Sequence, residues 1–142
     1  MFSISNDIYQ AIQGTNIVIE EVTEASALRL LSDIKKKYID SSQKSVWLWE
    51  QLAEYEYISD NNAWSYIKDF ISNNECIMFF NIGDEDKMFR ISNGNDLNYI
   101  LAETFGYEFY ITNEDTSFLL CFNHHDILYA AGEAKKWIKT LV

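Results

Sequence analysis

Two runs of residues that are apolar at every position constrain the fold more than any other feature of the sequence. The runs are "CIMFF" at 76–80 and "FLLCF" at 118–122, and an acidic turn, "GDED" or "NEDT", separates each from a second apolar run. Two apolar runs around a short turn are typical of a β-hairpin. Strands that lack polar alternation are covered on both faces or lie in the centre of their sheet. We therefore expect two hairpins with buried strands.

Other segments of the chain show the apolar spacing and end signals of helices. A first helix is predicted after Ser5 or Asn6, and a second begins at Thr23, with lysines near its end that match the helix dipole. A third helix, capped by Asn95, links the two hairpins. A helical hairpin is predicted at residues 45–72, with its two helices joined at 59–62. A C-terminal amphipathic helix is predicted from Ile127 onward.

These elements predict a single α+β domain over residues 1–142. Its antiparallel sheet has four to five strands, formed by the two hairpins and the short strand at 15–22, and N-terminal helices and the C-terminal amphipathic helix pack against it. The strand "YEFYIT" alternates polar and apolar residues, so we expect one of its faces to contact water.

The charge of the chain is strongly negative and unevenly distributed. The net charge is −11, and residues 45–126 carry 15 acidic and 3 basic side chains. Such a field repels nucleic acid and anionic lipid and accelerates encounter with a basic protein. No apolar run is long enough for a membrane span, and the N-terminus lacks the features of a signal peptide. We expect a cytoplasmic protein without a nucleic-acid or membrane partner and without a cofactor; the oligomeric state stays open.

The stretch "CFNHHDILYAAG" at 121–132 contains both histidines of the chain. The residues that could form a site there are Cys121, Asn123, His124, His125 and Asp126. Cys121 and His124 have half the spacing of a zinc site, and a His beside an acid or a thiol can act in catalysis. A second ligand pair and a Gly-rich oxyanion turn are both absent from the sequence. We therefore interpret the stretch as a structural corner with Asn123 as a cap, and predict no metal and no catalytic residue.

Aromatic and acidic side chains alternate in the stretch at 47–70. Because two helices cannot bury all of its rings, we expect some rings to lie at the surface beside carboxylates, and Trp and Tyr are frequent in interface hot spots. The acids at the two hairpin tips, including Glu114 and Asp115, are expected to extend this surface along one edge of the sheet. The predicted partner-binding residues are Trp49, Glu50, Glu54, Tyr55, Glu56, Tyr57, Asp60, Asp84, Glu85 and Asp86.

A small, acidic, ring-rich α+β chain without a phosphate loop or a hydrolase motif resembles the bacterial toxin-immunity proteins, and among them the SUKH-type superfamily. The resemblance rests on the general character of the whole chain. The stretches "YEFYIT" and "SFLLCFNHHDILYAAG" are similar to a family signature, while the Pro and Gly residues of the SUKH superfamily's N-terminal motif are missing. The resemblance implies a non-enzymatic protein that binds and neutralises a basic toxin, often a nuclease. No functional residue is carried over. The alternative is a small metal-dependent or His-assisted enzyme centred on the Cys-x-x-His-His-Asp corner.

Overall fold

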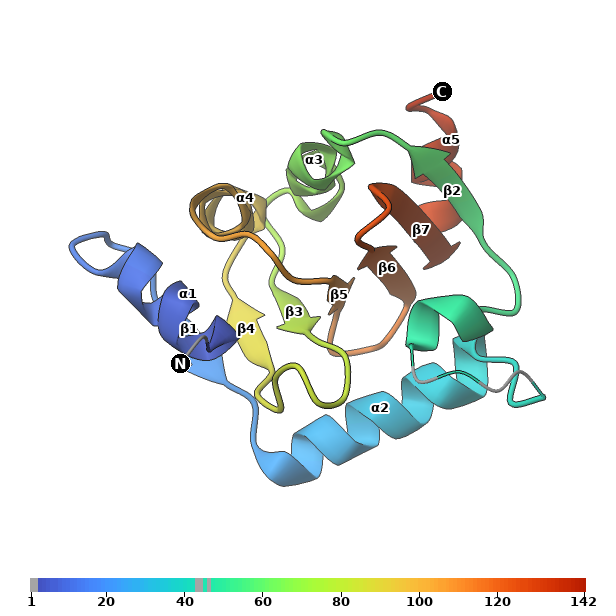
Figure 1. The fold of residues 1–142 in the computed structure, drawn as a ribbon, viewed down its shortest axis with the longest axis horizontal. Coiled ribbons are helices and arrows are strands. Elements are labelled where there is room, and N and C mark those ends of the chain that lie inside the picture. Colours follow the sequence, from blue (N-terminus) through green and yellow to red (C-terminus); the bar gives the residue numbers. More distant parts are fainter. Residues whose placement is uncertain (1–2, 43–44, 46) are drawn as a thin grey trace.

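A computed structural model describes residues 3–42, 45 and 47–142 and shows, in this part of the chain, a seven-stranded antiparallel sheet with helices on both faces (Figure 1). The helices are α1 (Ile4–Ile12), α2 (Glu24–Tyr38), α3 (Ile67–Ile71), α4 (Gly94–Glu103) and α5 (Ala134–Lys139), with the 3₁₀ helices η1 (Leu48–Gln51) and η2 (Ala63–Tyr66). The strands are β1 (Ile19–Glu21), β2 (Glu56–Ser59), β3 (Cys76–Phe79), β4 (Phe89–Ile91), β5 (Phe109–Thr112), β6 (Phe118–Phe122) and β7 (Ile127–Gly132). Their order across the sheet is β1-β4-β3-β5-β6-β7-β2.

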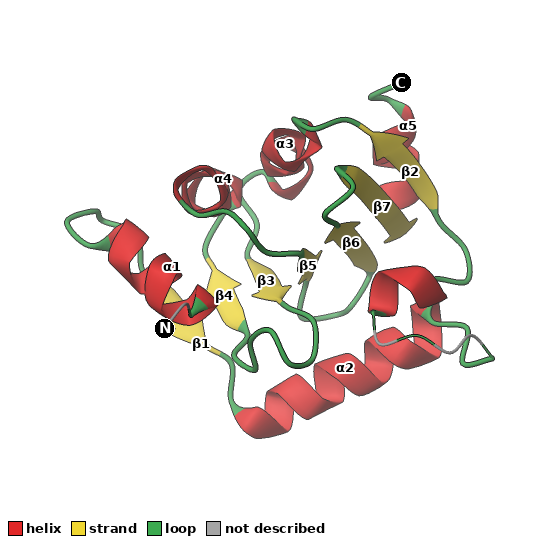
Figure 2. Ribbon diagram, viewed as in Figure 1, coloured by secondary structure: helices red, strands yellow, loops and turns green. Residues whose placement is uncertain are grey.

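The sheet lies between two helical layers, as Figure 2 shows. On one side, here called the α2 face, Ile77, Tyr110 and Leu119 of the sheet pack in one cluster with Leu30 and Ile34 of α2. On the other side, the α4 face, the alternate strand residues pack with α1, α3, α4 and α5. The central strands β3 and β5 are buried at every residue because both faces are covered.

Several predicted elements are confirmed. The two hairpins β3–β4 and β5–β6 are present and α4 links them, and α2 begins after its predicted cap, Thr23, whose side chain accepts a hydrogen bond from the Ser26 backbone N–H. The caps of the two other helices differ from the prediction by a short shift along the chain. Ser3 caps α1 and Asn93 caps α4, in each case by accepting a hydrogen bond from a backbone N–H of the first turn. None of the helices in the described residues is both long and apolar enough to cross a bilayer.

The predicted helical hairpin at 45–72 is wrong. The described part of this segment forms η1, the strand β2, η2 and the short helix α3. Strand β2 pairs with β7 along the edge of the sheet, with Tyr57 opposite Tyr129. Apolar residues at helical spacing misled the prediction, whereas the alternation in "EYEYIS" was the signal of the strand, and the cross-strand pairing with β7 stabilises it.

The predicted C-terminal helix begins later than expected, because residues 127–132 form the strand β7 and only Ala134–Lys139 are helical. The adjacent alanines 130 and 131 favour a helix locally, but here they lie on opposite faces of the sheet, in its two cores. Gly132 ends the strand with φ +66°, and an added Cβ would lie 2.5 Å from the carbonyl oxygen of Ser117. The turn from strand to helix therefore requires glycine.

Three further expectations about the sheet are wrong. The sheet has seven strands in the described residues rather than four to five, because β2 and β7 were read as helix. Strand β5 is buried on both faces, so neither contacts water. The β3–β4 turn and the β5–β6 turn lie at opposite ends of the sheet, because β3 and β5 are antiparallel, with Phe79 opposite Tyr110 and Ile77 opposite Thr112.

Candidate functional site

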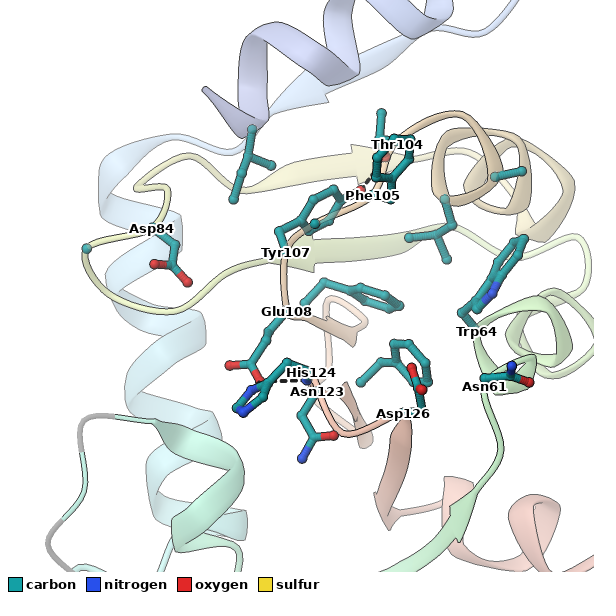
Figure 3. A pocket seen from close by; sticks show the side chains of 17 residues that line it. Asn61, Trp64, Asp84, Thr104, Phe105, Tyr107, Glu108, Asn123, His124 and Asp126 are labelled. Carbon is teal, nitrogen blue, oxygen red and sulfur yellow. Dashed lines mark hydrogen bonds and ion pairs between the residues drawn. The ribbon is translucent and has the colours of Figure 1, made fainter. Parts of the chain in front are cut away.

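A buried carboxylate lies at the end of the sheet where β5 begins. Glu108 is 8% exposed and accepts four hydrogen bonds. Its Oε1 atom accepts from Trp49 Nε1 at 3.0 Å and from Asn81 Nδ2 at 2.8 Å. Its Oε2 atom accepts from the backbone N–H of His124 at 2.9 Å and pairs with His124 Nδ1 at 2.6 Å. Glu108 thus joins η1, the β3–β4 turn and the β6–β7 turn. Figure 3 shows its contact with His124 of the β6–β7 turn.

A second set of contacts holds Asn81 in place. The Tyr110 hydroxyl donates to Asn81 Oδ1 at 2.5 Å, so the amide nitrogen of Asn81 is directed at Glu108. The same nitrogen donates to Asp84 Oδ2 at 3.3 Å. The carboxylates of Asp84 and Glu108 therefore share one neutral donor.

Hydrogen bonds keep Glu108 ionised despite its burial. Burial by itself raises the pKa of a carboxyl group, but the bonds from the backbone and ring of His124, from Trp49 and from Asn81 outweigh it, so the pKa of Glu108 lies below its ordinary value. Because a carboxylate only accepts, the Nδ1 atom of His124 carries a hydrogen. The imidazole is fixed in orientation while half of the side chain stays exposed.

The predicted corner is a hairpin turn between β6 and β7. Asn123 Oδ1 accepts hydrogen bonds from the backbone N–H groups of His125, at 3.0 Å, and Ile127, at 3.1 Å. Asn123 therefore caps backbone donors as expected, but those of a turn rather than of a helix, because Ile127 begins a strand. Asp126 adopts the left-handed conformation with φ 59°.

Cys121 belongs to the α2-face core and not to the exposed part of this corner. It is 1% exposed, and burial raises the pKa of its thiol well above the ordinary value, so the thiol is protonated and shielded. Cys76 is likewise buried, with a pKa of about 12. Within the described residues, no cluster of three or more His, Cys, Asp or Glu side chains could hold a metal ion.

A continuous group of rings covers the α2 face of the sheet at its β7–β2 edge. We call Trp47, Trp49, Tyr55, Tyr57 and Tyr129 the aromatic face. Trp47 and Trp49 stack at 5.4 Å, Trp49 stacks on Tyr129 at 6.1 Å, and Tyr55 and Tyr57 lie 5.2 and 6.1 Å from Tyr129. Tyr55 is 43% and Tyr57 58% exposed, so this part of the sheet lacks the covering that α2 provides elsewhere.

The predicted acidic residues near this face have different roles in the structure. Glu50 and Glu54 are exposed and adjoin Trp49 and Tyr55 in the sequence. Glu56 is placed by strand alternation on the opposite face, where Lys139 of α5 lies 3.4 Å away. Asp60 accepts hydrogen bonds from the Asn62 backbone and from the Tyr66 hydroxyl, so it stabilises the turn after β2.

The three acids of the β3–β4 turn do not join the aromatic face as one group. Asp84 accepts a hydrogen bond from Asn81, Glu85 accepts a hydrogen bond from the backbone of Ser5 at 2.9 Å, and Asp86 is exposed. The acids of the other hairpin tip lie at the far end of the sheet, where Glu114 forms ion pairs with Arg29 at 2.7 Å and with Arg90.

A hollow of about 860 Å³ opens on the other side of Glu108, between the end of α4, η2 and the β6–β7 turn. Figure 3 shows Asp84 and Glu108 on one side of it and Asp126, Asn61 and Trp64 on the other. Its lining consists of carboxylates, amides, the His124 imidazole, the Thr104 hydroxyl and aromatic or apolar side chains, and it contains neither Lys nor Arg.

Sequence reasoning placed Asn123, His124 and Trp49 in candidate sites but missed Glu108 and Asn81. The available signal was a single acid inside the apolar run "YEFYIT", because a carboxylate in a strand that is otherwise buried needs hydrogen-bond donors. The donors lie far from Glu108 in the sequence, so their identity depends on the tertiary structure.

Comparison with known proteins assigns the chain to a family without assigning an activity. The chain belongs to the family of unknown function DUF6756, whose model matches residues 2–141. No curated protein and no solved structure matches it.

Proposed function

We propose that this member of the DUF6756 family is a binding protein that neutralises a basic protein toxin, in the way that bacterial immunity proteins do. The observation that supports the proposal most strongly is the aromatic face with its exposed Tyr55 and Tyr57, in a segment that also carries the exposed acids Glu50 and Glu54. Trp and Tyr are enriched among the few residues that dominate the binding energy of protein interfaces, and surrounding carboxylates favour a partner of positive charge.

The charge around the aromatic face supports a basic partner rather than a neutral one. From residue 45 to residue 67 the sequence contains no Lys or Arg. A nuclease fits this surface well, because a protein that binds nucleic acid needs a basic surface, and an acidic inhibitor that covers that surface blocks the substrate.

The edge of the sheet adds a second means of contact. Strand β2 is the last strand in the order of the described sheet, and Tyr57 projects from it. Backbone groups on the outer side of an edge strand can pair with a strand of another chain, which would place the partner directly beside the rings.

The test uses a partner isolated from cells that make this protein and then studied in purified form. We expect a basic protein whose binding weakens with added salt, is lost in Tyr57→Ala and is kept in Tyr99→Ala, an exposed tyrosine of α4. Glu54→Lys should slow association at low salt, whereas Asp69→Lys, on α3, should not. Equimolar protein should abolish the partner's activity.

Two outcomes would contradict the proposal. One is a bound protein whose activity is unchanged by the complex, which would leave binding without neutralisation. The other is equal binding by Tyr57→Ala and Tyr99→Ala, which would place the interface elsewhere.

A second candidate is a His-assisted reaction, and the pair of Glu108 and His124 favours it. A carboxylate that holds Nδ1–H orients the imidazole as in general-base sites. The Nε2 atom of the half-exposed His124 side chain would then accept the proton from an attacking water. Turnover of ester or phosphoester substrates that is lost in His124→Gln but kept in His125→Gln would support this candidate.

A further inference from the structure

We propose that the outer edge of strand β2 binds an extended segment of the toxin as an added antiparallel strand, and that this segment carries Lys or Arg on both sides of a short β-branched stretch. This inference rests on the proposed function and deepens it, because it names the part of a basic partner that the edge of the sheet would take.

The hydrogen bonds between β2 and β7 show which backbone groups of β2 point away from the sheet. The Asp60 N–H donates to the carbonyl oxygen of Asp126 at 3.0 Å. The pair before it is Ser59 opposite Ile127, and the Ile127 carbonyl accepts its hydrogen bond from the β6 side of the strand. Because hydrogen-bonded and non-hydrogen-bonded pairs alternate in an antiparallel ladder, the N–H and C=O groups of Tyr57 and Ser59 point outward.

These outward groups lie at an exposed edge. Strand β2 is the last strand in the order of the described sheet, and Figure 1 shows it at the margin of the sheet next to α5. Tyr57 is 58% exposed and Ser59 is exposed as well. N–H and C=O groups in a row at such an edge form a template for a strand from another chain.

The side chains of β2 favour β-branched residues in the added strand. Strand alternation places Tyr57 on the side of the aromatic face, where the ring centroids of Tyr55 and Tyr129 lie 6.3 and 6.1 Å from its own. A strand beside β2 would place every second side chain next to Tyr57. Pairs of aromatic and β-branched side chains across neighbouring strands stabilise a sheet.

The charges along β2 favour a basic segment and disfavour a second copy of this chain. Glu54 precedes the strand and Asp60 follows it, and residues 45–67 include no Lys or Arg. If two copies paired with Tyr57 opposite Tyr57, Glu54 of one would lie opposite Asp60 of the other. A shift by two residues, the smallest that keeps the outward groups paired, would place Glu56 opposite Glu56 or Asp60. Like charges opposite each other destabilise a sheet, whereas Lys or Arg at these positions would stabilise it.

The experiment uses the peptide acetyl-Lys-Val-Thr-Val-Thr-Val-Lys-amide as the probe. Its valines would lie opposite the outward residues of β2, and its lysines opposite Glu54 and Asp60. NMR spectra of the protein report the amide signals of Tyr57, Ile58 and Ser59. In the protein alone, the Ile58 amide should exchange with solvent more slowly than the other two, because only Ile58 donates to β7. The peptide should cause saturable shifts of the Tyr57 and Ser59 signals and slow the exchange of both amides.

Three modified peptides separate backbone pairing and charge from other contacts. N-methylation of the central valine removes an N–H that points to β2, so binding should weaken at least about tenfold, the equivalent of about one hydrogen bond. N-methylation of a threonine removes an N–H that points away from β2 and should leave binding nearly unchanged. A peptide with glutamate in place of both lysines should bind about tenfold more weakly.

The matched protein variants change the backbone of the edge and keep its charge. Ser59→Pro removes an outward N–H that β7 does not use, and proline is tolerated in an edge strand at such a position, so the circular dichroism spectrum should be retained. Binding of the peptide should weaken at least about tenfold. Ser59→Ala keeps the N–H and should bind as the wild type does.

Three outcomes would overturn the inference. They are the lack of saturable binding of the lysine peptide, equal binding of the N-methylvaline and N-methylthreonine peptides, and binding of the glutamate peptide as tight as that of the lysine peptide. A dimer in sedimentation experiments that is lost in Ser59→Pro would also overturn it, because the occupant of the edge would then be a second copy.

A failure of strand addition can be distinguished from a failure of the proposed function. A basic partner that binds Ser59→Pro as tightly as the wild type, but does not bind Tyr57→Ala, would overturn strand addition and leave neutralisation in place. Binding of the lysine peptide together with a partner whose activity is unchanged in the complex would support the strand site and contradict the proposed function.

Discussion

Glu108 and Glu114 flank the same strand, β5, but their surroundings differ in almost every respect. Glu114 is half exposed, and two cations, Arg29 and Arg90, hold it at the turn between β5 and β6. Glu108 is buried, and its hydrogen-bond donors come from an indole, an amide and the backbone and ring of a histidine. Each carboxyl group has a lowered pKa, through the Arg90 and Arg29 contacts at Glu114 and through hydrogen bonds that outweigh burial at Glu108.

The comparison shows that the carboxylates at the two ends of the sheet are stabilised in different ways. At the Glu114 end, α2 fastens the β5–β6 turn: Lys37 donates to Thr116 Oγ1 at 2.9 Å and the Tyr38 hydroxyl donates to the carbonyl of Thr116 at 2.6 Å. At the Glu108 end, the carboxylate joins η1 to the β3–β4 and β6–β7 turns, and of these three elements only the two turns line the hollow beside it. The carboxylate at one end is therefore held by two arginines, and the carboxylate at the other end is held by hydrogen bonds from an indole, an amide and a histidine.

The largest difference in stability between the two ends of the sheet should appear when the carboxylate of Glu108 or of Glu114 is removed. Glu108→Ala leaves the buried donors of Trp49 and Asn81 without partners, at about 1–3 kcal/mol for each, so we expect a loss of about 3 kcal/mol or more in the free energy of unfolding. Glu114→Ala should lose no more than about 1 kcal/mol, because its ion pairs are exposed. Urea unfolding followed by circular dichroism measures both. Equal losses would refute the contrast.

A smaller difference in stability should appear between the wild type and Glu108→Gln at acidic pH. A carboxyl whose pKa is lowered in the folded state contributes stability above its ordinary value of 4.5, and that contribution is lost as the pH falls through the folded-state pKa. Between about pH 6 and about pH 3, the wild type should thus lose more stability than Glu108→Gln, in which this group cannot titrate.

The salt dependence of this acid effect separates the two carboxylates. The difference in acid-induced loss of stability between the wild type and Glu108→Gln should persist in about 1 M NaCl, because the donors to Glu108 are buried hydrogen-bonding groups. The corresponding difference for Glu114→Gln should shrink at that salt concentration, because exposed charges are screened. If the free energy of unfolding changed with pH in the same way for the wild type and Glu108→Gln, the lowered pKa of Glu108 would be contradicted.

The smallest effect on stability is expected when the cationic residues that pair with these surface carboxylates are replaced. Arg90 lies near Glu20, Glu75 and Glu114, and Arg90→Gln should reduce the free energy of unfolding by about 0.5–1 kcal/mol at low salt. The loss should vanish at high salt. Lys87→Gln, which removes the exposed pair with Glu21, is the matched control and should have a smaller effect. A loss of several kcal/mol that is independent of salt would mean that Arg90 acts through packing.

Elements with local end signals could be predicted from the sequence. Helix α2 combines its cap at Thr23 with lysines in its last turn, and the two hairpins combine apolar runs with acidic turns. Strands β2 and β7 could not be recognised with the same reasoning, because their apolar residues also match helical spacing. Pairing between Tyr57 and Tyr129, which are distant in the sequence, decided in favour of strands.

The candidate site shows the same division. Trp49, Tyr55 and Tyr57 were predicted at the surface from the excess of rings in their segment. Tyr55 and Tyr57 are exposed, whereas Trp49 is partly buried against the α2-face core and donates a hydrogen bond to Glu108. The excess of rings does not say which acids lie beside them. Glu56 faces α5 because strand alternation turns it to the opposite side.

The sequence by itself determined the mixed helix and sheet class, the buried hairpins and the acidic, ring-rich character of the chain, because composition and short-range periodicity encode these properties. Only the tertiary structure decided the seven-stranded order, the burial of Glu108 and the hollow beside it. The physical reason is that a buried carboxylate is stabilised by donors from distant segments. Trp49, Asn81 and His124 meet at Glu108 only when the sheet brings their loops to one end.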